Sequence, residues 1–268
     1  DKVFRDGRIH PMIKIGTAWV EDLANAALEL IYPPLPRCPF CGRTGPAVPS
    51  IGICSKCLQQ LPIIEGPVCA RCGRPVRNVT KGVCAECRDH ERFYQESRSV
   101  GLYRDYLRTL ILAIKYHGRS ELSIPLGRLI TARLEGEPRL GRVDGMIPIP
   151  LHPERLMQRG YNQADLIAYP ASKEFHIPVC PDVITRERRT ELQSKLSKEE
   201  RFNNVHDAFR LLRPGVIPGK RWLLVDDILT TGYTASECAK TLLTAGASWV
   251  GVITLAVGLI EEQWIDKE

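Results

Sequence analysis

Eight of the ten cysteines lie between residues 38 and 87, and all eight occur as Cys-x-x-Cys pairs. They are Cys38, Cys41, Cys54, Cys57, Cys69, Cys72, Cys84 and Cys87. The last four repeat the first four at offsets of 31, 31, 30 and 30 residues, which predicts two copies of one small ribbon. Because each pair offers two thiolates and zinc takes four ligands, two pairs complete one tetrahedral site. We therefore predict two structural zinc ions, each bound by four cysteines that are consecutive along the chain.

Glycine follows the second cysteine of each ribbon, at Gly42 and Gly73. A left-handed backbone at these positions lets amide hydrogens approach the sulfurs, which favours zinc. Redox dithiols or a single iron–sulfur cluster are the alternatives. Since little apolar sequence separates the ligands, the module should depend on metal for its fold.

The expected location of the protein follows from its cysteines and its first residues. Cysteine pairs that bind metal indicate a reducing compartment. The first fifteen residues contain no continuous apolar stretch typical of a secretory signal. Residues 241–260 carry no charge, but Gly246, Gly251 and several β-branched residues predict a helix end, a turn and a buried strand instead of a membrane span. We expect a cytoplasmic protein.

Length and composition predict two unequal domains, since 268 residues with 44% hydrophobic content can bury one sizeable core beside a smaller module. We assign residues 1–37 to a helical lead-in, 38–95 to a double zinc ribbon and 96–268 to an α/β domain with parallel strands. Its candidate strands are residues 145–150, 179–184, 222–226 and 249–255. Residues 186–204 are polar and predict a mobile loop, with a short helix within it as the alternative. The formal charge of +6 suits phosphate-rich ligands or nucleic acid without choosing between them.

The stretch of residues 223–234 reads Leu-Leu-Val-Asp-Asp-Ile-Leu-Thr-Thr-Gly-Tyr-Thr, an apolar strand that runs into two acids, small hydroxyls, glycine and a helix. Open α/β sheets bind ligands at such strand ends. Backbone amides and hydroxyls of residues 230–234 predict a phosphate cradle at the helix N-terminus. Asp226 and Asp227 suit the vicinal hydroxyls of a ribose. The alternative is that both acids lie at a strand end and cap the helix.

Cationic residues elsewhere in the chain are candidates for contact with the same ligand. A predicted strand at residues 147–150 leads into a basic turn and helix that carry Arg155 and Arg159. Arginine side chains at these positions can donate paired hydrogen bonds to the oxygens of a diphosphate. Lys115 is a further candidate, with a solvent-exposed lysine as the equal alternative.

Taken together, these motifs resemble the ComF family of competence-associated proteins, from about residue 30 to residue 258. The stretch 223–234 is similar to the ribosyl-diphosphate loop of type I phosphoribosyltransferases. The resemblance also rests on Arg159-Gly160-Tyr161-Asn162-Gln163, Arg186-x-Arg188-x-Thr190-x-x-Gln193, Lys115-Tyr116-His117-Gly118, Arg201, Asn204 and Ala208-Phe209. The chain departs from the pattern at Arg189 and at Tyr169-Pro170, which we expect to interrupt a helix after Leu166.

The resemblance implies a type I phosphoribosyltransferase-like parallel sheet flanked by helices, with an N-terminal double zinc ribbon. It implies that the chain binds 5-phosphoribosyl diphosphate with Mg²⁺ and is linked to DNA uptake in natural transformation. The catalytic residues it implies are Asp226, Asp227, Arg186 and Arg188, and the ligand-binding residues are Thr230, Thr231, Gly232, Tyr233, Thr234, Arg155, Arg159 and Lys115.

The resemblance leaves the biochemical role open. One reading is an active transferase, in which a nucleophile replaces diphosphate at ribose C1. Another is a non-catalytic module that binds single-stranded DNA, and a third is an adaptor that docks other DNA-uptake proteins. The sequence does not identify an acceptor substrate.

Overall fold

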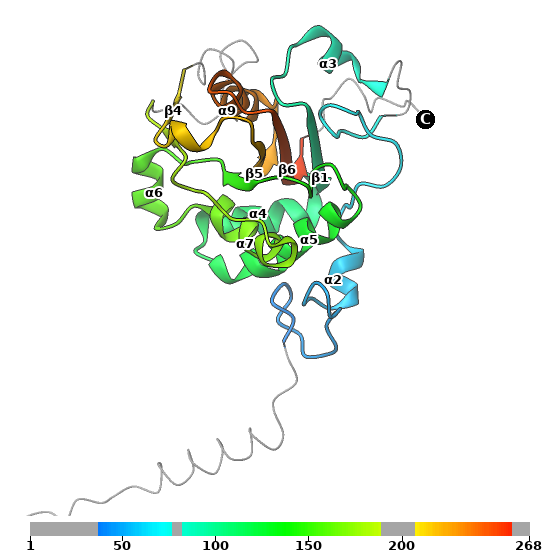
Figure 1. Ribbon diagram of the computed structural model, residues 1–268. Coiled ribbons are helices and arrows are strands. Elements are labelled where there is room, and N and C mark those ends of the chain that lie inside the picture. The colour runs from blue at the N-terminus through cyan, green and yellow to red at the C-terminus, as the bar shows by residue number, and fades with distance from the viewer. Residues whose placement is uncertain (1–36, 77–81, 189–206, 259–268) are drawn as a thin grey trace, which may run out of the picture.

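The computed structural model describes residues 37–76, 82–188 and 207–258 (Figure 1). The predicted lead-in therefore lies outside the described residues, except for Arg37. Most of the loop predicted at residues 186–204 lies outside them as well, including Arg189, Thr190, Gln193, Arg201 and Asn204.

A parallel sheet with strand order β1-β6-β5-β2 forms the centre of the molecule. Its strands are β1 (Glu96–Leu102), β2 (Gly145–Pro148), β5 (Arg221–Leu229) and β6 (Trp249–Val257), and every neighbouring pair is parallel. All nine residues of β6 are buried, as expected for a strand covered on both faces. The predicted class, an α/β fold with parallel strands, is confirmed.

A separate two-stranded antiparallel sheet joins β3 (Ile184–Arg186) to β4 (Phe209–Leu211). The strand predicted at residues 179–184 is therefore wrong in its bounds and its sheet. Val179 makes only a single bridge to Met146, and regular pairing begins at Ile184. Apolar spacing did not reveal this change of partner, because a short apolar run looks the same in either sheet.

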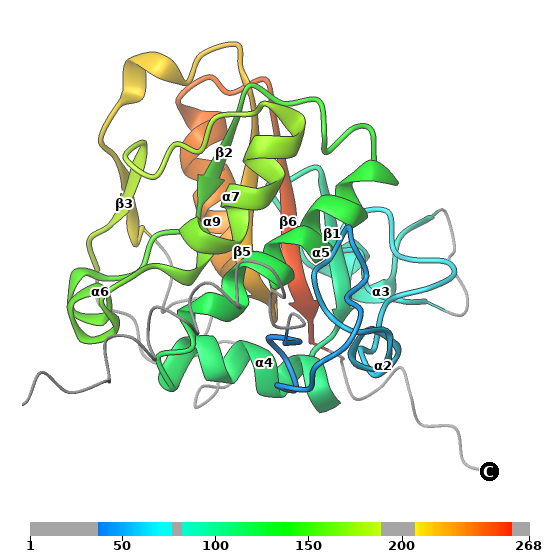
Figure 2. The ribbon, with the colours of Figure 1, turned by 90° about the horizontal axis from the view of Figure 1, so that it is seen from below.

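Helices cover both faces of the parallel sheet (Figures 1 and 2). On one face lie α4 (Asp105–Tyr116), α5 (Ser123–Glu135) and α7 (Gln163–Phe175), and on the other lies α9 (Tyr233–Thr244). The short helix α6 (Pro153–Arg159) follows β2, and α2 (Ser55–Gln59) and α3 (Ala85–Asp89) belong to the cysteine ribbons. Short 3₁₀ turns occur at Ser120–Leu122 and Pro214–Val216.

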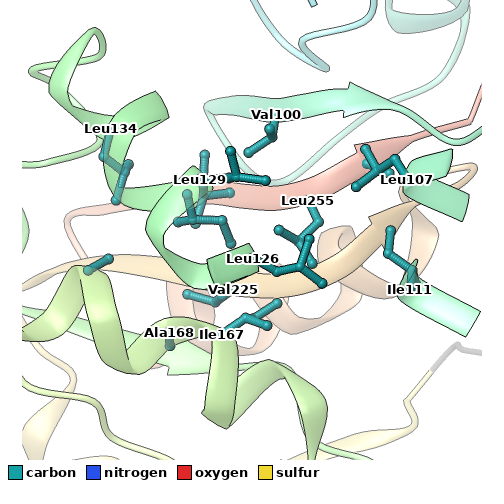
Figure 3. Packing of buried hydrophobic residues seen from close by; sticks show 14 of the residues in the cluster. Val100, Leu107, Ile111, Leu126, Leu129, Leu134, Ile167, Ala168, Val225 and Leu255 are labelled. Carbon is teal, nitrogen blue, oxygen red and sulfur yellow. The ribbon is translucent and has the colours of Figure 1, made fainter. Parts of the chain in front are cut away.

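The larger core lies between α5, α7 and the sheet, where Leu126, Ile167 and Val225 pack together (Figure 3). The two helices approach closely at Gly127, where a Cβ would lie 2.6 Å from the carbonyl oxygen of Ile167 and 2.7 Å from the Pro170 ring. Helix α7 runs through Pro170 without ending. The expected interruption at Tyr169-Pro170 is therefore wrong, because the proline ring packs on Gly127.

The segment between the two ribbons crosses the edge of the sheet at β1. The amide of Ile64 donates to the carbonyl of Val100 (3.0 Å), and the amide of Leu102 donates to the carbonyl of Pro62 (2.8 Å). As a result, the two ribbons pack on opposite faces of the sheet. The first joins the core on the face covered by α4, α5 and α7, and the second joins the core on the face covered by α9. In the described part of the chain, no helix is long and apolar enough to cross a membrane.

Candidate functional site

Two separate clusters of four cysteines hold the sulfurs close together. Cys38, Cys41, Cys54 and Cys57 form the first cluster, Cys69, Cys72, Cys84 and Cys87 form the second, and within each the sulfurs lie within 4.8 Å of one another. The cysteines thus group in chain order, as predicted.

The sulfur separations match a tetrahedral metal site. A zinc–sulfur bond of about 2.3 Å places the sulfurs of a tetrahedron about 3.8 Å apart. The measured separations are 3.8 Å for Cys38–Cys57, 3.8 Å for Cys41–Cys54 and 3.7 Å for Cys72–Cys84. A disulfide would require about 2 Å. The donor set therefore fits two structural zinc ions.

The turn formed by the first Cys-x-x-Cys pair, here called the knuckle, has the same geometry in both ribbons. Gly42 and Gly73 have φ of 71° and 68°, and the amides of Cys54 and Cys84 approach the sulfurs of Cys38 and Cys69 at 3.4 and 3.3 Å. Such amide contacts stabilise thiolate ligands.

The loop of residues 230–234 connects β5 to α9 at the carboxyl end of the strand (Figure 1). Gly232 is the N-cap of α9 with φ 82°, and no side chain caps the helix there. The first amides of α9 therefore face the loop with the positive end of the helix dipole. The Thr231 hydroxyl is buried and finds no hydrogen-bond partner within the described chain. The loop thus combines backbone and hydroxyl donors that suit an anion.

The two acids at the end of β5 have different surroundings. Asp227 is buried, and its Oδ1 lies 2.7 Å from Lys115 Nζ of α4. Its Oδ2 is buried and has no hydrogen-bond partner in the part of the chain that the structure describes. Burial opposes the charge of Lys115, but attraction to Asp227 outweighs it and raises the pKa of Lys115.

Asp226 contacts the backbone of its neighbour. Its Oδ1 accepts a hydrogen bond from the Asp227 amide (2.8 Å). Burial, followed by the negative charge of Asp227, raises the pKa of Asp226 to about 7, although Lys115 and Arg186 act in the opposite direction. Asp226 therefore changes its protonation state near neutral pH.

Arg186 lies within electrostatic range of both Asp226 and Arg155. Burial lowers the pKa of Arg186, and the charges of Asp226 and Arg155 also act on it. The Arg186 guanidinium lies 5.5 Å from the Phe209 ring centroid. The structure thus brings Lys115 of α4 and Arg186 of β3 to the acids, and it places Arg155 of α6 near Arg186. Arg188 is exposed, at the last described residues before the gap.

Much of the Arg159-Gly160-Tyr161-Asn162-Gln163 motif makes scaffold contacts. The Tyr161 hydroxyl donates to the Ile114 carbonyl (2.5 Å), Asn162 caps α7, and its amide nitrogen donates to the Ile149 carbonyl (3.2 Å). Arg159 donates to Gln163 and lies 5.7 Å from the ring centroid of the exposed Tyr116. These residues fix α7 against α4 and β2 and place Arg159 beside Tyr116.

Arg74 and Tyr94 contact the loop of residues 230–234 from the side of the second ribbon, a role that the sequence did not reveal. Arg74 of the second ribbon donates to the carbonyls of Thr230 and Gly258. A Cβ on Gly232 would lie 2.8 Å from the Tyr94 hydroxyl. The one available signal was an arginine directly after Gly73, and it appears identically in the first ribbon as Arg43.

Comparison with known proteins identifies relatives over most of the chain. A family model described as a double zinc ribbon domain matches residues 27–97. DNA utilization protein YhgH from Escherichia coli is 35% identical over 204 residues, which cover 75% of this chain and 88% of the relative. Competence protein F from Haemophilus influenzae is 31% identical over 82% of this chain and 96% of the relative. Competence protein ComFC from Bacillus subtilis is 30% identical over 77% and 85%.

Solved structures with a similar arrangement include phosphoribosylpyrophosphate synthetase from Mycobacterium smegmatis, with a TM-score of 0.30 and 16% identity, covering 49% of this chain and 33% of that one. Purine phosphoribosyltransferase from Pyrococcus horikoshii has a TM-score of 0.29 and 18% identity, covering 48% and 70%.

Proposed function

The chain belongs to the ComF family of competence-associated proteins, with a double zinc ribbon and a phosphoribosyltransferase-like sheet, and on this premise we propose that it binds 5-phosphoribosyl diphosphate with Mg²⁺. In this proposal the 5-phosphate occupies the loop of residues 230–234. The ribose hydroxyls contact Asp226 and Asp227, and Arg155 and Arg186 face the diphosphate.

One observation carries the proposal. Two polar atoms, Thr231 Oγ1 in the loop before α9 and Asp227 Oδ2 near the end of β5, are buried and have no hydrogen-bond partner among the described residues. A buried polar atom without a partner costs about 1–3 kcal/mol. A donor for phosphate and an acceptor for a sugar hydroxyl, four residues apart where β5 runs into the loop, suit the two ends of a ribose 5-phosphate.

Charge in the site suits a ligand with two phosphate groups. Lys115, Arg155 and Arg186 supply three cations, and Asp227 offsets one of them. The carboxylates of Asp226 and Asp227 are oxygen ligands of the kind that Mg²⁺ prefers. When bound, Mg²⁺ would neutralise part of the charge on the diphosphate.

If the chain is a transferase, its own residues act mainly by position and charge. A nucleophile bonds to ribose C1 while the bond from C1 to the diphosphate oxygen breaks, and diphosphate leaves with that electron pair. Positive charge develops on the ribose ring, where ionised Asp226 stabilises it, and Arg155 and Arg186 receive the departing diphosphate. The acceptor nucleophile is not specified by the described residues.

Calorimetry with 5-phosphoribosyl diphosphate and Mg²⁺ tests the proposal on the zinc-loaded chain. Thr231→Val keeps the shape of the side chain but removes the hydroxyl, so it should leave the fold intact and weaken binding by roughly tenfold. Asp226→Asn should weaken binding as well. Thr109→Val is the matched control, because that hydroxyl contacts only the Asp105 carbonyl of its own helix in the described structure. Absence of binding by the unaltered chain would reject the proposal.

A second candidate function is contact with single-stranded DNA. Its support is the family assignment together with the exposed ring of Tyr116, over which Arg159 lies. Aromatic and arginine faces at the rim of a cationic site can stack on bases. Fluorescence anisotropy with labelled oligonucleotides at several salt concentrations tests this function, and Tyr116→Ala should weaken binding. Affinity that does not change with salt would argue against it.

A further inference from the structure

The two ribbons present an equivalent arginine in different surroundings. In each ribbon the first cysteine amide donates to the carbonyl of that arginine, from Cys38 to Arg43 at 2.9 Å and from Cys69 to Arg74 at 2.8 Å. The cysteine knuckle therefore fixes the backbone of both arginines in the same way. Arg43 is exposed, but Arg74 is only 3% exposed.

The Arg74 side chain joins the ends of two strands at the candidate phosphate loop. Its Nη2 donates to the Thr230 carbonyl at the start of the loop, and its Nε donates to the Gly258 carbonyl at 3.0 Å. The Gly258 amide in turn donates to the Leu229 carbonyl at 2.9 Å. One guanidinium thus holds the end of β5 and the residue that follows β6, and charged donors make the stronger hydrogen bonds.

The segment after the second ribbon adds contacts to the same loop and to α9. The Phe93 amide donates to Ser236 Oγ at 3.0 Å, and the Arg92 guanidinium carbon lies 4.9 Å from the Tyr233 ring centroid. Arg92 also pairs with Glu86 of α3 at 3.3 Å. Because α3 begins directly after Cys84, the second cysteine cluster connects to the loop along two routes, through Arg74 and through Arg92.

The first ribbon contacts a different part of the molecule. Cys57 Sγ lies 3.7 Å from the Tyr106 hydroxyl, and the Arg119 guanidinium donates to the Pro39 carbonyl at 3.2 Å. Tyr106 lies in the first turn of α4, and Lys115 lies nine positions further on, about 14 Å along the helix. These contacts connect the first ribbon to the acids along the length of α4.

We propose that zinc in the second cysteine cluster positions the phosphate loop through Arg74, and so sets the affinity of the ribosyl-phosphate site, whereas zinc in the first cluster does not. The proposal rests on the proposed function and names Arg74 as a positioning residue. The metal is required because a knuckle with little apolar sequence does not keep its turn without it. Once the turn is lost, the backbone of Arg74 is no longer held in place, and its guanidinium no longer reaches the Thr230 and Gly258 carbonyls in a fixed geometry.

A matched pair of variants separates this role from a general effect on the ribbons. Arg74→Met keeps much of the apolar volume and removes the donors, and Arg43→Met makes the same change at the equivalent exposed position. In the ligand-free, zinc-loaded chain, Arg74→Met should accelerate hydrogen exchange at the amides of residues 229–235, and Arg43→Met should not. With 5-phosphoribosyl diphosphate, Arg74→Met should weaken binding by roughly tenfold. Equal exchange in both variants would overturn the proposal.

A second pair tests the metal itself. Cys87→Ser and Cys57→Ser remove the equivalent fourth ligand of each cluster, and zinc content should fall by one ion per chain in both. Loop exchange should rise in Cys87→Ser alone, and a similar rise in Cys57→Ser would overturn the proposal. If the unaltered chain bound no 5-phosphoribosyl diphosphate, the proposed function would fail, yet an exchange difference confined to Arg74→Met and Cys87→Ser would still support the coupling.

Discussion

The first ribbon packs its knuckles against the start of α4, and the second packs its knuckles against β1 and the loop that precedes α9. Their local geometry is the same, down to the glycine φ and the amide contact to the first sulfur. What differs is the environment. A Cβ on Gly42 would meet nothing within 4 Å, whereas a Cβ on Gly73 would lie 2.4 Å from the Ser97 carbonyl oxygen. A repeated unit can thus keep its metal geometry and acquire a second role from the surface it covers.

The largest expected difference between the ribbons is in zinc release. Cys41 of the first cluster is exposed, whereas three cysteines of the second are buried and Cys87 is half-buried. Zinc contributes about 10–16 kcal/mol in small modules of this kind, so a ribbon that loses its ion should unfold. A chelator should remove the first ion faster, in two resolved phases followed with a zinc-sensitive dye. Cys57→Ser should abolish the fast phase. If Cys87→Ser abolished it instead, the second cluster would be the one that releases its ion faster.

The ion pair between Lys115 and Asp227 gives the next largest effect, because it ties the helix beside the first ribbon to the site. Lys115→Met leaves the Asp227 carboxylate buried without its cation, which should cost about 3–5 kcal/mol in free energy of unfolding. The exposed pair at the other end of α4, Arg104–Asp105, is the control, and Arg104→Ala should cost less than about 1 kcal/mol. Denaturant unfolding measures both changes, and equal losses would contradict the burial argument.

Glycine replacement compares the two knuckles directly. Gly42→Ala and Gly73→Ala both force a side chain into the left-handed region, which costs about 1–2 kcal/mol. Gly73→Ala adds the collision with the Ser97 carbonyl, a backbone atom that cannot move aside cheaply. Competition with a calibrated chelator should therefore show a larger loss of zinc affinity for Gly73→Ala. Similar losses would show that the backbone of β1 at Ser97 shifts to make room for the added methyl group.

A pH titration separates the electrostatic role of α4 from its role in packing. The folded pKa of Asp226, about 7, lies above its usual value of 3.8, so the folded chain binds the extra proton between these values and loses stability as pH rises through that window. Ligand binding should change in the opposite sense, since ionised Asp226 accepts hydrogen bonds from ribose hydroxyls.

The affinity for 5-phosphoribosyl diphosphate should therefore rise toward pH 7, by up to about tenfold per pH unit, and level off above it. Asp226→Asn should flatten the profile. Lys115→Met should move the midpoint upward, because Lys115 lowers the pKa of Asp226. A profile that is unchanged in Asp226→Asn would assign the titration to another group.

The sequence was sufficient to predict the elements that depend on local pattern. Cysteine spacing predicted two clusters in chain order, and the run from Leu223 to Thr234 predicted a strand, a loop and a helix in the observed order, although β5 continues to Leu229, beyond the predicted end at residue 226. Both signals lie within short segments whose residue types are restricted by metal geometry or by backbone conformation. The uncharged stretch after residue 241 was interpreted correctly for the same reason, with a turn at Gly246 before β6.

Contacts between distant segments were beyond such reasoning. Arg74 and Thr230 are 156 positions apart, and Arg43 carries the same local signature without the contact. The motif at residues 159–163 has the composition of a ligand site, yet Tyr161 donates to a carbonyl of α4 and Asn162 donates to the Ile149 carbonyl just after β2. A sequence shows which side chain is present. Which carbonyl or carboxylate that side chain contacts depends on the path of the chain, here on how the segment between the two ribbons crosses the edge of the sheet at β1.

The smallest expected effects concern two tyrosine hydroxyls, one beside each ribbon. Burial raises the pKa of Tyr94, and its neutral hydroxyl has no hydrogen-bond partner in the described chain, so Tyr94→Phe should leave the free energy of unfolding unchanged or raise it slightly. The Tyr106 hydroxyl lies 3.7 Å from Cys57 Sγ, where it can donate to a thiolate, so Tyr106→Phe should cost about 1 kcal/mol. Thermal unfolding of the zinc-loaded variants measures both. If Tyr94→Phe instead weakened binding of 5-phosphoribosyl diphosphate, the hydroxyl behind Gly232 would be a ligand donor, and the second ribbon's side of the loop would contact the phosphate directly as well as support it.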